Sequence, residues 1–263
     1  MSPILAVRNL EKTFGSVVAA RDISLDVPPA QTIGIIGANG AGKTTFVNMI
    51  TGHIEPSKGS IRFEDKDITG LPSRAITRLG ISRSFQVAQI FPSLTVHENV
   101  CAAAAIARGK DSILARALQP MQSPAAIAEA EAIIELFQIA GYRDVLASTL
   151  PQGARKLLDI AMAVCGSPRL LLLDEPTSGI SIEEKFAIMD VVMSALRSRN
   201  ITILFVEHDM DIVARFADRV LAFYDGTVIA DGTPEGVLAD PQVKAFISGT
   251  KLAAAPQGRS TDA

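Results

Sequence analysis

Two kinds of hydrophobic pattern follow one another along this chain. Short, mostly apolar runs occur at residues 33–36, 170–173 and 201–206, and such runs are typical of parallel strands that are buried on both faces. Between them, apolar residues recur every three or four positions, which predicts amphipathic helices. One such stripe consists of Ile182, Phe186, Met189, Met193 and Leu196. Because strands and helices alternate, we expect an α/β fold with a mostly parallel sheet.

Shorter strands and a hairpin are predicted near both ends of the chain. Asp225 and Gly226 form a pair that favours a tight hairpin turn. A last helix should reach Phe246, and the small, polar residues from Ala253 onward predict a disordered tail. The remaining predicted strands are residues 4–7, 23–27, 61–64 and 81–85.

An alanine-rich block at residues 95–137 has the composition of helices and few strand signals. It lies between two strand-bearing halves, so we expect an inserted helical subdomain that closes near Leu150. A helix carrying Leu157, Ile160, Ala161 and Val164 follows and should stop at Gly166. Two capping boxes are predicted at helix starts, one pairing Thr95 with Glu98 and one pairing Ser181 with Glu184.

Composition narrows the classes of protein that the chain can belong to. The 263 residues carry a net charge of −3 and are 48% hydrophobic, which favours one large packed domain without a nucleic-acid surface. Cys101 and Cys165 lie in apolar surroundings and are interpreted as buried thiols. The three histidines lack zinc spacing, and His97 is interpreted as solvated. We find no secretion signal and no membrane span, and expect a cytoplasmic protein.

A glycine-rich stretch, G-A-N-G-A-G-K-T-T, follows the run at residues 33–36 and opens a predicted helix. Its spacing is G-x-x-x-x-G-K-[ST], in which glycines let backbone N–H groups wrap a triphosphate and the helix N-terminus adds its positive dipole. A chance match would occur in about one chain per hundred of this length. We therefore predict an ATP phosphate site made of Gly37, Ala38, Asn39, Gly40, Ala41, Gly42, Lys43, Thr44 and Thr45.

Polar residues stand directly after the other predicted parallel strands. They are Gln86, the acidic pair Asp174 and Glu175, and His208. Parallel sheets bind ligands beyond the carboxyl ends of their strands, so these side chains should meet at one edge. For the acidic pair alone, capping of a helix is the alternative interpretation.

The chemistry of ATP hydrolysis suggests a role for each group. Magnesium prefers a few hard oxygen ligands, which Thr44 and Asp174 supply, the latter either directly or through water. Glu175 is suited to orient or deprotonate the attacking water, Gln86 to bridge metal and water, and His208 to contact the γ-phosphate. Phe14, ahead of the glycine-rich stretch, either stacks on the adenine ring or packs within a small sheet.

Together these residues resemble the ATP-binding subunit of an ABC transporter, from about residue 5 to residue 249. The resemblance implies Walker A at residues 37–45, a glutamine loop at Gln86, the signature position at residues 150–154, Walker B with a general base at Asp174 and Glu175, a switch histidine at His208, and adenine stacking on Phe14. It also implies one domain over residues 1–250. In it, a RecA-like core and an antiparallel β-subdomain take up about 1–86 and 160–250, a helical subdomain takes up 87–159, and 251–263 form a tail.

Further motifs resemble the branched-chain, or hydrophobic, amino acid uptake ATPases. They are R-S-F-Q at 83–86, L-T-V-H-E-N-V at 94–100, E-H-D-M at 207–210 and A-D-G-T-P-E at 230–235. Alternatives are the ATPase of a lipopolysaccharide-export transporter, a soluble ABC ATPase acting on DNA or ribosomes, and a P-loop kinase. A kinase has no need of the glutamine, signature and histidine loops together.

Two positions depart from the family pattern. The signature, usually L-S-G-G-Q, is L-P-Q-G-A here, which keeps Gly153 but loses the serine hydroxyl and, at Pro151, a backbone N–H. Ser181 stands where an acidic residue or asparagine is usual. The resemblance implies a head-to-tail dimer in which Gly153 contacts the partner's ATP, and the weak signature favours a paralogous partner over a second copy. The other implied partners are permease subunits, docked near residues 86–100 on the inner face of the membrane, and, indirectly, a periplasmic solute-binding protein.

Overall fold

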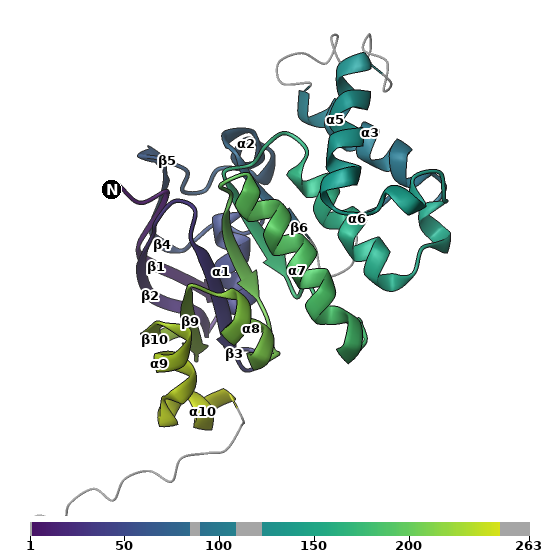
Figure 1. Cartoon of the computed structure of the whole chain (residues 1–263). Helices are drawn as coiled ribbons and strands as arrows, with labels where there is room; N and C mark the ends of the chain where they lie inside the picture. The colour runs from purple at the N-terminus through teal and green to yellow at the C-terminus, as the bar shows by residue number, and fades with distance from the viewer. Residues whose placement is uncertain (1, 85–89, 109–122, 248–263) are drawn as a thin grey trace, which may run out of the picture.

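The computed structural model describes residues 2–84, 90–108 and 123–247, which form two sheets and a set of covering helices (Figure 1). The six-stranded sheet has the order β10-β9-β3-β8-β7-β6, and its strands from β9 to β6 run parallel. Its strands are β3 (Thr32–Gly37), β6 (Ile81–Ser84), β7 (Leu170–Asp174), β8 (Thr202–Val206), β9 (Arg219–Tyr224) and β10 (Thr227–Gly232). The predicted α/β fold with a mostly parallel sheet is confirmed.

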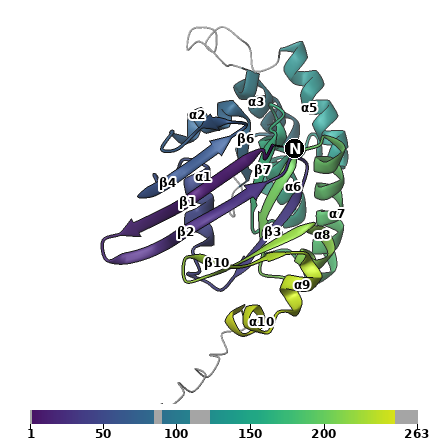
Figure 2. The same cartoon turned by 90° about the vertical axis from the view of Figure 1, so that its left-hand side faces the viewer.

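The second sheet is antiparallel and has the order β2-β1-β4-β5. Figure 2 shows its long β1–β2 hairpin extending beside β4. Its strands are β1 (Leu5–Phe14), β2 (Val17–Val27), β4 (Lys58–Phe63) and β5 (Lys66–Asp67). The first two strands are longer than predicted, because register shifts between Val7 and Leu10 and between Leu10 and Lys12 interrupt the alternation of polar and apolar residues.

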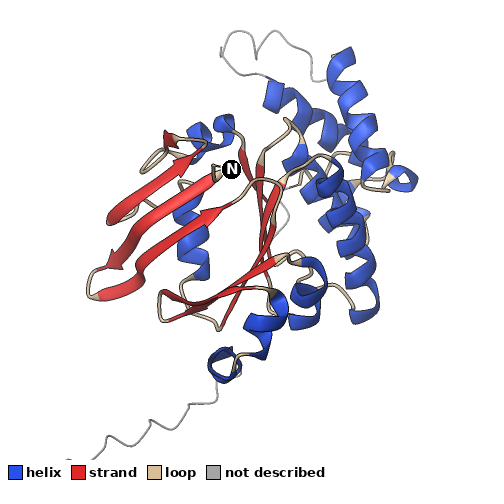
Figure 3. Cartoon of the chain, turned by 60° about the vertical axis from the view of Figure 1, so that its left-hand side comes forward, coloured by secondary structure: helices blue, strands red, loops and turns tan. Residues whose placement is uncertain are grey.

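Helices cover both faces of the parallel sheet. Figure 3 shows α1 between the two sheets and the remaining large helices on the opposite side. The helices are α1 (Lys43–Ile50), α2 (Ser73–Leu79), α3 (Val96–Arg108), α5 (Pro124–Leu136), α6 (Gln152–Val164), α7 (Ile182–Ser198), α8 (Met210–Phe216), α9 (Pro234–Ala239) and α10 (Pro241–Ile247), with short 3-10 turns at Ala140–Tyr142 and Ala147–Thr149. Among the described residues, no helix combines the length and the apolar character needed to cross a membrane.

The leucine run of β7 shows why this strand has no alternation. Leu171 and Leu173 belong to a core shared with α6 and α7, whereas Leu170 and Leu172 belong to the core around α1 and the small sheet. Both faces of the strand are therefore buried, as the sequence predicted. The boundary expected between residues 159 and 160 falls inside α6, a continuous helix.

Several predictions made from short stretches of sequence can be compared with the structure. The capping box at the start of α3 is confirmed: the Glu98 carboxylate accepts from the Thr95 N–H, and the Glu98 N–H donates to the Thr95 hydroxyl. The hairpin turn at Asp225 and Gly226 is also confirmed, with φ values of 46° and 76°. Both cysteines are buried, as predicted. The predicted tail lies outside the described residues.

Two local predictions were wrong. Ser181 occupies the N-cap position of α7 but makes no side-chain cap, because its hydroxyl instead lies 3.1 Å from the Glu184 carboxylate. His97 is not solvated: its side chain is 16% exposed and its Nε2 lies 3.2 Å from Glu131 on α5. Packing of α3 against α5 brings that carboxylate to the ring, and no local pattern could predict it.

Candidate nucleotide site

The glycine-rich loop connects the end of β3 to the start of α1, as predicted. Gly37 and Gly42 have φ values of 148° and 101°. A Cβ atom at Gly37 would lie 2.4 Å from the Phe223 carbonyl oxygen, and one at Gly42 would lie 2.7 Å from the Ala19 carbonyl oxygen. Side chains are thus excluded by both backbone conformation and close approach. No side chain caps α1, so its first N–H groups stay available to an anion.

Lys43 is folded back onto this loop. Its Nζ donates to the carbonyl oxygens of Gly37 at 2.6 Å and Ala38 at 3.0 Å. Burial lowers the pKa of the Lys43 ammonium, while the nearby carboxylates Glu175 and Asp174 act in the opposite direction. The ammonium is held by weak neutral acceptors that a phosphate oxygen can replace.

A cavity of about 150 Å³ lies over the loop. It brings the loop together with side chains from two other strand ends, as predicted for a parallel sheet. Its lining comprises Ala19, Asn39, Gly40, Ala41, Gly42, Lys43, Thr44, Thr45, Glu175, Val206 and His208. The sequence interpretation missed Ala19 and Val206, which contribute through their position rather than through reactive groups.

Glu175 and His208 contact each other across this cavity. The Nε2 of His208 lies 3.0 Å from a carboxylate oxygen of Glu175. Glu175 has a φ of 47°, a left-handed conformation that residues with a side chain seldom adopt. Its N–H donates to the Val206 carbonyl, which ties it to the neighbouring strand β8. Such strain is concentrated at functional sites.

The loop after Glu175 is fixed by hydrogen bonds to a buried carboxylate, that of Glu207. Glu207 is 3% exposed, and its Oε1 accepts from both the N–H and the hydroxyl of Thr177, at 2.9 and 2.7 Å. These bonds connect the segment after β7 to the segment after β8. The sequence interpretation did not assign Glu207 this role, although its place after a buried strand was visible.

Asp174 ends β7 and is bonded to Arg83 of β6. One guanidinium nitrogen lies 2.5 Å from Asp174 Oδ2 and the other lies 2.6 Å from the Asn48 amide oxygen. The sequence interpretation quoted Arg83 only as part of a motif and missed both contacts. Asp174 and the Thr44 hydroxyl are hard oxygen donors, which is the chemistry that magnesium prefers.

Five of the predicted site residues that the structure describes are not part of the cavity lining: Phe14, Gly37, Ala38, Gly153 and Asp174. Phe14 ends β1 with 48% of its surface exposed and the Lys12 ammonium 5.1 Å from its ring centroid. About half of its surface is therefore covered by the small sheet and half is available to a ligand. Gly153 lies in the first turn of α6, where a Cβ would meet Ile188 Cδ1 at 2.5 Å. Gln86 lies outside the described residues.

Comparison with known sequences places this arrangement among related proteins. The family described as ABC transporter matches residues 20–178. The branched-chain amino acid transport ATP-binding protein LivG of Escherichia coli is 34% identical over 245 residues, covering 92% of this chain and 96% of LivG. BraF of Pseudomonas aeruginosa, described in the same terms, is 33% identical over 249 residues, covering 93% of this chain and 98% of BraF.

Solved structures agree with these sequence matches. MJ1267, an ATP-binding cassette of an ABC transporter, superposes with a TM-score of 0.82 at 30% identity, covering 94% of this chain and 99% of that one. Its ADP conformation superposes with a TM-score of 0.81, covering 95% and 100%. The fold is that of an ABC ATPase cassette.

Proposed function

The chain belongs to the ABC transporter family as one of its ATP-binding, ATP-hydrolysing subunits, and on that premise we propose that it powers uptake of branched-chain or other hydrophobic amino acids. The observation that supports hydrolysis is the contact between Glu175 and His208 beside the phosphate loop, at 3.0 Å. The importer role and the solute class rest on similarity to LivG and BraF over almost the whole chain.

In the proposed reaction, Lys43 exchanges its two backbone carbonyls for the β- and γ-phosphates, which gives each ammonium hydrogen bond a charged acceptor. Glu175 orients the attacking water and accepts its proton. His208 holds the Glu175 carboxylate until nucleotide binds and then contacts the γ-phosphate. Phe14 stacks on the adenine ring from the exposed end of β1.

Thr44, Asp174 and Gln86 are the residues proposed to hold magnesium. When bound, the ion would neutralise charge on the phosphate oxygens. Few protein ligands are needed, because magnesium keeps several waters and takes the remaining oxygens from the nucleotide.

We propose that two ATP-binding subunits meet head to tail. Gly153 and the N-terminus of α6 then face the γ-phosphate bound by the partner. Because the signature lacks the serine hydroxyl, and α6 begins after Pro151, the donors on this side are fewer than in an intact signature. A paralogue with an intact signature is therefore the proposed partner.

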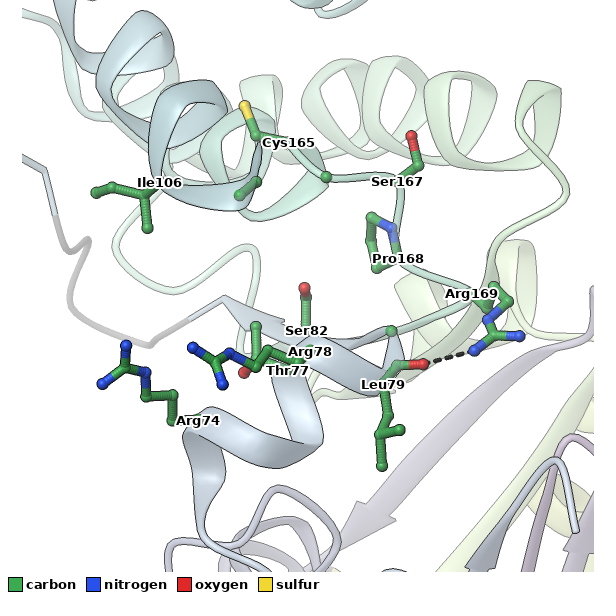
Figure 4. A pocket seen from close by; sticks show the side chains of 13 residues that line it. Arg74, Thr77, Arg78, Leu79, Ser82, Ile106, Cys165, Ser167, Pro168 and Arg169 are labelled. Atoms are coloured by element: carbon green, nitrogen blue, oxygen red, sulfur yellow. Dashed lines mark hydrogen bonds between the residues drawn. The ribbon is translucent and has the colours of Figure 1, made fainter. Parts of the chain in front are cut away.

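Permease subunits are proposed to dock in a groove between α2 and the helices α3 and α6. Two cavities of 450 and 410 Å³ share the lining residues Thr77, Ser82, Ile106, Ala107 and Cys165. Figure 4 shows Arg74 and Arg78 of α2 on one side and Ile106 and Cys165 on the other. This combination suits a helical segment with an apolar face and an acidic edge. Phe91 lines the second cavity, within the docking region proposed at residues 86–100.

Docking in this groove would place the subunit on the cytoplasmic face of the membrane, where a periplasmic solute-binding protein reaches it only through the permease.

Transport measurements test the proposed function. The chain is assembled with candidate permease, paralogue and binding-protein subunits in proteoliposomes, and ATP-dependent uptake of labelled leucine is followed. We expect uptake that is abolished by Glu175→Gln in this chain. An assembled complex that hydrolyses ATP in response to lipopolysaccharide, and takes up no hydrophobic amino acid, would favour the export alternative.

A further inference from the structure

The buried contact between Arg83 and Asp174 is a feature of the site that the proposed reaction does not use. The two side chains are 9% and 13% exposed, so the guanidinium and the carboxylate are both largely removed from water. A buried ion pair of this kind is costly to form unless further hydrogen bonds complete it. Here Asn48 of α1 supplies one, at 2.6 Å from the second guanidinium nitrogen.

Strand register explains why these three groups meet. In the parallel pair of β6 and β7, Arg83 lies opposite Leu172. Asp174 follows Leu172 by two residues, so the side chains of Leu172 and Asp174 point to the same face of the sheet. Arg83, as the register partner of Leu172, points to that face too. That face packs against α1, since Leu172 shares its core cluster with Phe46 and Met49. The long side chain of Arg83 on β6 can therefore contact both Asp174, at the next position on the same face of β7, and the helix α1 that covers this face.

The contact constrains the carboxylate in a specific way. Arg83 bonds Oδ2 of Asp174, so Oδ1 would be the oxygen that faces a bound magnesium ion or its water. The planar guanidinium bonds two oxygen acceptors on separate elements at once, an arrangement that a lysine ammonium with its different geometry does not reproduce. Groups that orient a ligand in this way typically change metal affinity by 10- to 100-fold when they are removed.

We propose that Arg83, anchored by Asn48, is a positioning residue that holds Asp174 in the orientation required for magnesium. Arg83 also lines the second groove cavity, so a segment docked there would lie against the residue that orients the metal ligand. This inference rests on the proposed magnesium role of Asp174 and is independent of the transported solute.

Nucleotide binding with and without magnesium tests the proposal. The affinity of the full-length purified chain for a fluorescent ATP analogue is measured with excess MgCl2 and again with EDTA. In EDTA, we expect Arg83→Gln and Arg83→Lys to bind the nucleotide as tightly as the wild type does. The increase in affinity on adding magnesium should be about tenfold smaller than in the wild type. Asn48→Ala should show a smaller loss in the same direction.

Arg215→Gln is the matched control, because it also removes an arginine that pairs with an aspartate, here Asp190, in a contact between α8 and α7 where both side chains are about half exposed. On adding magnesium, its affinity should rise as much as that of the wild type. The positioning role would be overturned if magnesium raised the nucleotide affinity of the Arg83 variants as much as, or more than, that of the wild type. Equal losses of affinity in MgCl2 and in EDTA would overturn it as well. A wild-type affinity that does not respond to magnesium would overturn the metal assignment and this inference with it.

Discussion

At the scale of single residues, the site combines a glutamate in a strained backbone conformation, Glu175, with a histidine, His208, that contacts its carboxylate. Glu175 keeps a left-handed backbone conformation, which is maintained by its N–H bond to Val206 and by the neighbouring segment that Glu207 anchors. His208 then contacts the carboxylate without occupying the phosphate loop. This geometry supports the proposal that Glu175 accepts the proton while the glycine-rich loop binds the phosphates.

Replacing Glu175 by Gln should separate these two roles. We expect ATP binding to persist while hydrolysis falls at least 100-fold, because general-base groups typically contribute 10² to 10⁴ in rate. Phosphate release and the affinity for a fluorescent ATP analogue are the two measurements. Unhydrolysed ATP should also make a dimer visible by size-exclusion chromatography. Normal turnover by this variant would show that another group accepts the proton.

Cys165 provides a second prediction at the residue scale. Burial raises the pKa of its thiol to about 12, from an ordinary value of about 9. Because its pKa is raised in the folded state, the neutral Cys165 thiol makes its full contribution to the free energy of unfolding below about pH 9. That contribution is lost as the pH rises toward 12.

At pH 8, Cys165 should therefore react with a disulfide reagent far more slowly in the folded protein than in the denatured one. The Cys101→Ala variant isolates its rate. Rapid reaction in the folded protein would contradict the burial of this thiol.

At the scale of elements, two similar sequence patterns gave two different helix starts. Thr95 and Glu98 exchange bonds between side chains and backbone at the start of α3. Ser181 and Glu184 instead bond to each other, so the first turn of α7 receives no side-chain cap. The spacing is the same, but only at α3 do the two side chains also bond to the backbone N–H groups of the first turn.

Thr95→Ala should lower the free energy of unfolding by about 1 kcal/mol, the usual cost of losing a cap. Ser181→Ala is the matched comparison and should cost clearly less, since no backbone N–H loses its partner. Urea unfolding of the two variants measures both values. Equal losses would mean that Ser181 does cap α7 in solution.

At the scale of the whole molecule, the nucleotide cavity lies at one edge of the parallel sheet, while Gly153 does not line it. That separation supports the proposal that each ATP is completed by a second subunit. The groove between α2 and the helices α3 and α6, which combines arginine and apolar side chains, is the surface proposed for the permease.

ATPase activity should therefore depend on the identity of the partner subunit. We expect the purified chain to hydrolyse ATP slowly, and an equimolar mixture with a paralogue carrying an intact signature to exceed the sum of the two separate rates several-fold. The same mixture containing Glu175→Gln of this chain is the control. Equal specific activities for the chain alone and the mixture would count against a paralogous partner.

The sequence by itself determined the features that depend on neighbouring residues. Glycine spacing and a following helix specify the phosphate loop, because backbone conformation and dipole are local properties. The unbroken leucines of β7 predicted burial on both faces, and the carboxyl ends of the parallel strands predicted that Glu175 and His208 would meet. The family and its fold followed from these motifs.

Only the tertiary structure decided the contacts between segments far apart in the chain. Arg83 meets Asp174 across 91 residues because strand order puts β6 beside β7, and His97 meets Glu131 because α3 packs on α5. The bulges of β1 hid its true length by interrupting alternation. Such outcomes depend on register and packing, which a one-dimensional pattern of polar and apolar residues does not record.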